Sequence, residues 1–163
     1  MNADAARRQL EELVAGRRGW HLAEPEKGQV YAWRTVEIVD VAFHLFVERD
    51  AVQPLAGREM WTASFRSVGG SQSGSWSGTY DEVLVEIAQA ERCLDAVNSL
   101  RECQSRLAAH DLIDPLKGDD VRFICDLLDL SRWGVLSDLR RRIVSTTCGF
   151  RLDAEAINQA GRY

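Results

Sequence analysis

The stretch VYAWRTVEIVDVAFHLFVE, residues 30–48, decides the fold class of this chain. It is rich in valine, isoleucine and aromatic residues, which fit the pleated, half-buried surface of a sheet better than a helix. From residue 38 onward, side chains of two kinds alternate, and one face is wholly apolar: Val39, Val41, Phe43, Leu45 and Val47. The stretch therefore predicts two strands, over residues 30–35 and 38–48.

A helix and a loop are expected before this stretch, and a further strand is expected after it. Apolar side chains recur at helical spacing over residues 3–15 and predict an amphipathic helix there. The next stretch, GWHLAEPEKGQ at residues 19–29, contains proline and glycine and predicts a loop. A third strand is expected over residues 60–66, where apolar and polar side chains alternate again.

The glycine- and serine-rich stretch GGSQSGSWSG, residues 69–78, leads from the strands to the helices. It fits an edge strand with small side chains or a flexible connector, and we prefer the connector. Trp76 within it is expected either to plug the core or to contact a partner. Thr79 and Glu82 then form a capping box, whose side chains satisfy two free amide donors at a helix start. A long helix is expected from Thr79 to about Leu107.

The last third of the chain carries helical patterns. Residues 121–130 are apolar around most of a helical wheel, so neighbours must bury this helix, and Asp119 is expected to cap it. Another helix is expected over residues 136–144, and Asp153 suits the cap of a short last one.

Strands followed by helices predict an α+β fold. We expect an N-terminal helix, an antiparallel three- to four-stranded sheet packed by a long helix, and a helical C-terminal part. Residues 1–110 are expected to form an α-β-β-β-α domain. Residues 111–163 are expected to be a helical extension packed on it, or both to form one single domain.

Composition places the chain among ordinary globular proteins. It is 45% hydrophobic and 28% charged, with a mean hydropathy of −0.25, which excludes disordered and collagen-like classes. No apolar run approaches the length of a membrane span, and the acidic amino terminus is unlike a secretory signal. A cytoplasmic protein with no membrane association is expected.

Four cysteines, at positions 93, 103, 125 and 148, are spaced unlike any zinc ligand set. We expect them to be reduced and free of metal, and we expect no cofactor. Catalytic groups are equally sparse: Asp40, His44 and Glu48 share one face of a strand, but four residues of strand span about 13 Å, too far for a shared site. The protein is therefore expected to be non-enzymatic, and an enzyme whose site joins distant residues is the third alternative.

Charge is segregated along the chain. The basic residues are 18 Arg and 2 Lys, which suggests GC-rich codons and a bacterial, phage or plasmid source. Residues 79–138 hold 13 acids against 6 bases, whereas residues 139–163 hold 5 bases against 2 acids. An acidic helical face with a small basic end suits a protein partner. We expect an inhibitor, adaptor or immunity-type factor whose candidate contact residues are Trp76, Glu86, Asp95, Arg141 and Arg142.

The runner-up is a nucleic-acid-associated accessory protein that uses the arginine run at positions 140–142. A pI of about 5.2 opposes the electrostatic attraction on which such binding depends. On a helical wheel, Arg140 lies with the apolar residues, so it is expected to be structural and paired with Asp126 or Asp129. The 121–130 helix is expected in the core or in the interface of a homodimer.

Overall fold

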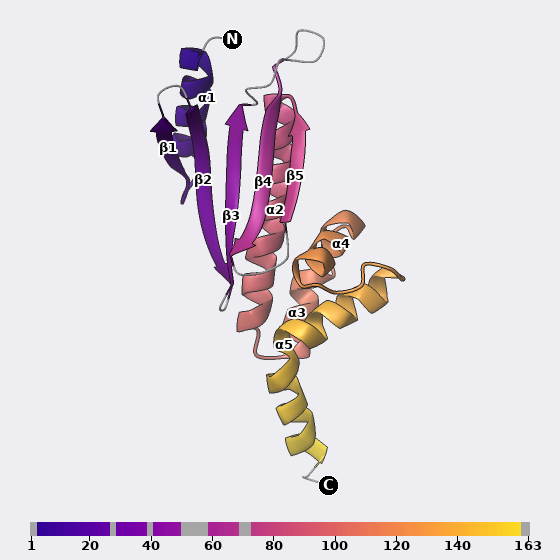
Figure 1. Cartoon of the computed structure of the whole chain (residues 1–163). Coiled ribbons are helices and arrows are strands. Elements are labelled where there is room, and N and C mark those ends of the chain that lie inside the picture. Colours follow the sequence, from indigo (N-terminus) through magenta and orange to yellow (C-terminus); the bar gives the residue numbers. More distant parts are fainter. Residues whose placement is uncertain (1–2, 27–28, 39–40, 50–58, 69–72, 161–163) are drawn as a thin grey trace. The chain divides into compact units, whose positions relative to one another are not determined.

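The fold is α+β, as the sequence predicted. The computed structural model describes residues 3–26, 29–38, 41–49, 59–68 and 73–160. The chain forms two compact units, residues 1–88 and residues 89–163 (Figure 1). The first unit holds the N-terminal helix, the whole sheet and the first turns of a long helix; the second holds the remaining helices.

The first unit begins with α1 (Ala3–Gly16), where the amphipathic spacing predicted a helix. Five strands follow and pair with their chain neighbours in one antiparallel sheet: β1 (His21–Glu26), β2 (Gln29–Ile38), β3 (Val41–Arg49), β4 (Trp61–Val68) and β5 (Ser73–Gly78). The boundary between the two central strands falls after Ile38, which pairs with Val41, so β2 is longer than expected.

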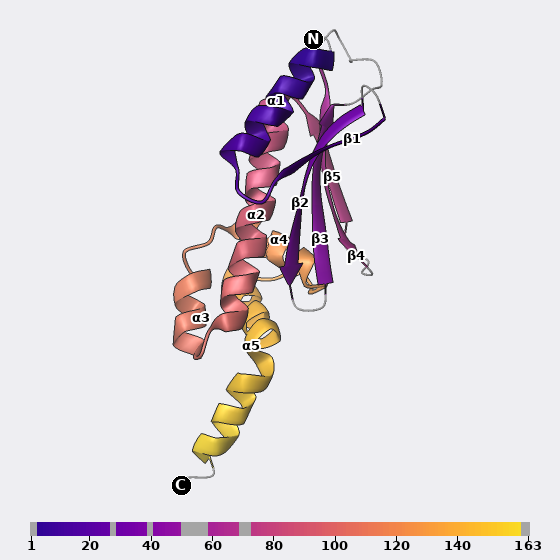
Figure 2. The same cartoon turned by 90° about the vertical axis from the view of Figure 1, so that its left-hand side faces the viewer.

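The core of this unit lies on one face of the sheet. The buried apolar side chains of the strands are Ala32, Val36, Phe43, Leu45, Val47, Trp61, Ala63 and Phe65. Figure 2 shows α1 and the first turns of α2 (Tyr80–Glu102) on the same side of the strands. Tyr80 joins the three elements, because its ring meets Trp61 edge to face at 4.9 Å and its hydroxyl donates to the carbonyl of Gln9 at 3.1 Å. Phe43, Leu45 and Val47 of the alternating pattern therefore face this core as expected, whereas Val39 lies outside the described residues.

The two edge strands correct the sequence prediction. Residues 21–26 were expected in a loop and form β1; for residues 73–78 the connector was preferred over an edge strand, and they form the edge strand β5. Both strands are held by main-chain pairing to a longer neighbour, and neither carries the alternation of large apolar side chains that marks a buried strand. The capping box is confirmed: the Thr79 amide donates to Glu82 Oε2 at 2.8 Å, and the Glu82 amide donates to Thr79 Oγ1 at 3.3 Å.

The second unit contains the end of α2 with α3 (Arg106–Ile113), α4 (Gly118–Leu127) and α5 (Leu136–Ala160). The long helix stops at Glu102 rather than near Leu107, because Ser105 caps a new helix by accepting a hydrogen bond from the Ala108 amide at 3.1 Å.

Two further expectations about this unit are wrong. Lys117, not Asp119, occupies the N-cap of α4, without a side-chain bond. No separate last helix begins at Asp153, because α5 continues to Ala160. Among the described residues, no helix is long and apolar enough to cross a membrane.

Residues after α4 close it by a tight turn. The Leu130 amide donates to the Cys125 carbonyl at 2.8 Å, and Asp129 between them has a φ of 55°. This is the left-handed region, in which glycine is usual and most other side chains are strained.

Candidate functional site

The face of the sheet opposite α1 and α2 is not covered by any described element of the first unit (Figure 2). Strand register places its side chains in rows, one of which runs His21, Trp33, Phe46, Ser64 and Ser75 across all five strands. We call this surface the open face. Its other members include Tyr31, Thr35, His44, Glu48, Thr62, Arg66 and Ser73.

Aromatic rings form the centre of the open face. Tyr31 and Phe46 lie 5.9 Å apart between ring centroids, and Trp33 stacks on His21 at 4.8 Å. Tyr31, Trp33 and Phe46 are partly exposed. Large apolar side chains on a sheet face that no described helix of the first unit covers are unlike the usual alternation of a two-layer fold, in which the outer face is polar.

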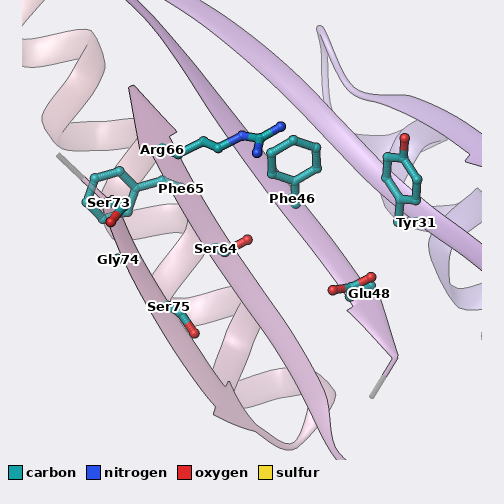
Figure 3. A pocket seen from close by; sticks show the side chains of 9 residues that line it. All are labelled: Tyr31, Phe46, Glu48, Ser64, Phe65, Arg66, Ser73, Gly74 and Ser75. Carbon is teal, nitrogen blue, oxygen red and sulfur yellow. The ribbon is translucent and has the colours of Figure 1, made fainter. Parts of the chain in front are cut away.

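A single arginine lies over this aromatic centre. The guanidinium carbon of Arg66 is 5.3 Å from the centroid of the Phe46 ring, a cation–π distance. Arg66 is exposed and forms no ion pair with the residues that the structure describes. Figure 3 shows it at one end of a shallow cavity of about 540 Å³, with Tyr31 and Glu48 from neighbouring strands farther along.

The rest of this cavity wall carries hydrogen-bonding groups of small size. Serine hydroxyls at Ser64, Ser73 and Ser75 line it, beside Gly74. The arrangement therefore offers an aromatic floor, one unpaired guanidinium and several hydroxyls that donate or accept.

His44 also lies on the open face. Its Nδ1 is 2.8 Å from Thr35 Oγ1, so a hydroxyl on the adjacent strand holds the ring. Asp40, which the sequence placed on the same strand face, lies outside the described residues. Within those residues, no group of three or more histidine, cysteine, aspartate or glutamate side chains gathers as metal ligands.

A second, smaller cavity lies between β5 and the start of α2. Its volume is about 360 Å³, and it is lined by Trp76, Ser77, Glu82, Val83 and Glu86. Trp76 packs against Phe65 with ring centroids 5.5 Å apart, so the indole closes the edge of the core and also faces this cavity. The structure thus brings together Trp76 and Glu86, two of the residues expected to contact a partner. We call this the edge cavity.

The other three expected contact residues belong to the second unit. Asp95 is exposed on α2. Arg141 pairs with Asp138 at 3.1 Å, and Arg142 donates to the carbonyls of Ser131 and Trp133 at 2.7 and 3.5 Å. Both arginines thus already have acceptors within the chain.

Arg140 is partly buried, but the prediction that it pairs with Asp126 or Asp129 is wrong. Its Nη2 donates to the carbonyl of Leu116 at 2.9 Å, in the turn between α3 and α4. Asp126 instead pairs with Arg132 at 3.3 Å, and Asp129 is exposed. The helical wheel oriented Arg140 correctly, but it carries no information about a main-chain carbonyl that a turn leaves free.

One polar cluster was missed from the sequence. Asp120 is 5% exposed and accepts hydrogen bonds at 3.1 Å from Gln89 Nε2 and from Arg92 Nε and Nη2. The Arg92 bonds are the main reason why the pKa of Asp120 lies below its usual value. A run of two aspartates at a helix start gives no sign that one of them is buried. The cluster joins α2 to α4 within the second unit, which is a structural role.

Comparison of the chain with protein-family models, with curated protein sequences and with solved structures finds no match. The surfaces of the chain itself are therefore the basis for assigning a function.

Proposed function

We propose that this protein acts without catalysis, by binding another protein through the open face of its sheet. The observation that carries the proposal is the aromatic centre formed by Tyr31, Trp33 and Phe46, partly exposed and overlaid by Arg66. Aromatic and arginine side chains are the types that are enriched in the energetically dominant part of protein interfaces. An inhibitor, adaptor or immunity-type factor of a bacterium, phage or plasmid fits this arrangement.

The surroundings of the aromatic centre suit an interface rim. Glu48 and the serines of β4 and β5 supply polar groups around the rings. A partner that covers the rings would exclude water from them and leave these polar groups to fix its orientation.

Nucleic-acid binding is the second candidate, because exposed aromatic rings on a sheet can stack bases. Charge argues against it. The chain has a net charge of −5, and all three arginines at positions 140–142 have acceptors within the chain. Backbone binding needs several cations that are free to meet phosphates.

The test compares two single variants as tagged bait in a lysate of the source cells. Phe46→Ser removes the central ring, and Val85→Ser is the matched control, because Val85 is an apolar side chain with 68% exposure on α2. We expect wild type and the control to enrich the same protein and Phe46→Ser to lose it. With the purified partner, calorimetry should show binding about 30-fold weaker for Phe46→Ser.

Two results would contradict this proposal. Equal capture by Phe46→Ser and wild type, with unchanged melting temperatures, would exclude the open face as the interface. A gel shift of single-stranded DNA or RNA at low salt that Phe46→Ser abolishes would favour the second candidate.

A further inference from the structure

The two edges of the sheet are built differently. At β1, the edge carries Pro25, two glutamates and an irregular register between Ala23 and Glu26, and Arg7 of α1 pairs with Glu24. These are the features by which natural proteins prevent an edge from pairing with another strand. The β1 edge is therefore protected.

The opposite edge lacks such protection. β5, Ser73–Gly78, is six residues long and has no charged residue, no proline and no irregular pairing. Its side chains are small except for Trp76, and in the described part of the chain only β4 pairs with it. An extended segment can therefore approach this edge closely and pair with it through main-chain hydrogen bonds.

The edge cavity specifies which segment fits. Trp76 lies on the sheet face that α2 covers, since it pairs with the buried Ala63. In an added strand, the residue opposite Trp76 would project to the same side, because directly paired residues share a face. Its side chain would therefore enter the edge cavity.

Two carboxylates line that cavity and favour a positively charged side chain. Glu82 and Glu86 are four residues apart on α2, so they share one side of the helix. Glu82 already accepts a bond from the Thr79 amide, whereas Glu86 forms no hydrogen bond or ion pair with any described residue. A guanidinium or ammonium group there would meet a carboxylate beside an indole ring.

We propose that the free edge of β5 binds an extended segment of a partner protein, as a sixth strand, with an arginine or lysine side chain seated between Trp76 and Glu86. Ser73 and Ser75 of β5 belong to the open face, but the arginine or lysine side chain would enter the edge cavity on the opposite face of the sheet. Either surface can therefore fail its test while the other passes.

The test uses two labelled peptides with blocked ends, in which valine and threonine alternate around one central residue. The central residue is arginine in one and citrulline, its neutral analogue, in the other. We expect the arginine peptide to bind about fivefold more tightly in fluorescence anisotropy. Amide exchange followed by NMR should slow at residues 73–78 in the complex.

Three variants test whether the edge cavity causes the preference for the arginine peptide. Glu86→Gln should lose most of the preference for arginine, because only the indole of Trp76 and Glu82 remain beside the cation. Glu102→Gln, which removes one exposed carboxylate from the other end of α2, should keep the full preference. Phe46→Ser should also keep it, which separates this edge from the open face.

Several results would overturn the proposal. These are no binding of either peptide at about 1 mM, equal affinity of wild type for both, or slowed exchange at β1 instead of β5. Sedimentation that shows a dimer, with residues 73–78 protected before any peptide is added, would assign the edge to a second copy of this chain and also overturn it.

Discussion

Asp120 shows how one buried carboxylate connects two helices of the second unit. Gln89 and Arg92 of α2 both donate to it, and its own main chain belongs to α4. Arg92 is about half exposed, so water weakens the ion pair and the hydrogen bonds contribute most.

We expect Asp120→Asn to lower the free energy of unfolding by about 1–2 kcal/mol at neutral pH. The folded-state pKa of Asp120 is lowered, chiefly by the Arg92 bonds. Its contribution is therefore complete above the unfolded value of about 3.9 and is lost as the pH falls through the folded value. Thermal melts between about pH 6 and pH 3 should thus show a smaller loss of stability in the variant than in wild type. Parallel pH profiles would contradict this assignment.

Gly74 is a position where space, not backbone angle, excludes a side chain. A Cβ atom there would lie 2.3 Å from Cε1 of Phe65, whose ring already packs against Trp76. Gly74→Ala should therefore cost about 1–3 kcal/mol through overpacking. Gly16 is the matched control, because a Cβ atom there would meet nothing within 4 Å. Gly16→Ala should leave the free energy of unfolding unchanged or raise it by up to about 1 kcal/mol. Urea titration of both variants checks the contrast, and equal midpoints would refute it.

At the scale of elements, α4 is a helix whose apolar side is buried by its own chain. Val121, Ile124, Cys125 and Leu127 are each 5% exposed or less, and the helix packs on α5. Burial within a single chain favours the core over a dimer interface for these side chains.

Leu127→Ala should accordingly cost about 2–5 kcal/mol, from lost burial and the cavity left behind. The expected result is a lower melting temperature with no change in sedimentation of the folded protein. A dimer that dissociates while each chain keeps its melting temperature would place Leu127 in an interface instead.

A strand could be predicted from the sequence only where its large apolar and polar side chains alternate. β3 and β4 alternate large apolar and smaller polar residues, and both were expected. β1 and β5 have few apolar side chains and are strands because a neighbour supplies hydrogen-bonding partners. Main-chain pairing of this kind leaves no periodic pattern in the side chains, so β1 was missed and β5 was only the less preferred alternative to a connector.

The same limit applied to the candidate sites. Trp76 and Glu86 were singled out separately, but the edge cavity that joins them requires β5 to be a strand. The aromatic centre of the open face was not predicted. The strand pattern did divide Phe46 from the apolar face, and a phenylalanine on the mixed face was the available signal.

Across the whole molecule, the four thiols differ in access to solvent. Cys93, Cys125 and Cys148 are buried, and Cys103 is partly exposed. Burial raises the pKa of Cys93 to about 12 and also raises the pKa of Cys125. The Cys148 thiol donates to the carbonyl of Leu100 at 3.2 Å.

We therefore expect iodoacetamide to label Cys103 first in the native protein and the other three only after denaturation, because the thiolate is the reactive form and needs access. Mass spectrometry of peptides from a time course measures this order. Labelling of Cys93 as fast as Cys103 without denaturant would contradict the burial described here.

A substitution in the turn after α4 is expected to make the protein more stable to heat. Asp129 holds a left-handed backbone that suits glycine better, and its carboxylate pairs with nothing in the described residues. Asp129→Gly should raise the free energy of unfolding by about 0.5–1 kcal/mol. Gly134, with a φ of 124°, should lose stability when changed to alanine. In differential scanning calorimetry, the unfolding transition should shift to higher temperature for Asp129→Gly and to lower temperature for Gly134→Ala. A shift of both to lower temperature would show that Asp129 stabilises this turn better than glycine does and would contradict the prediction.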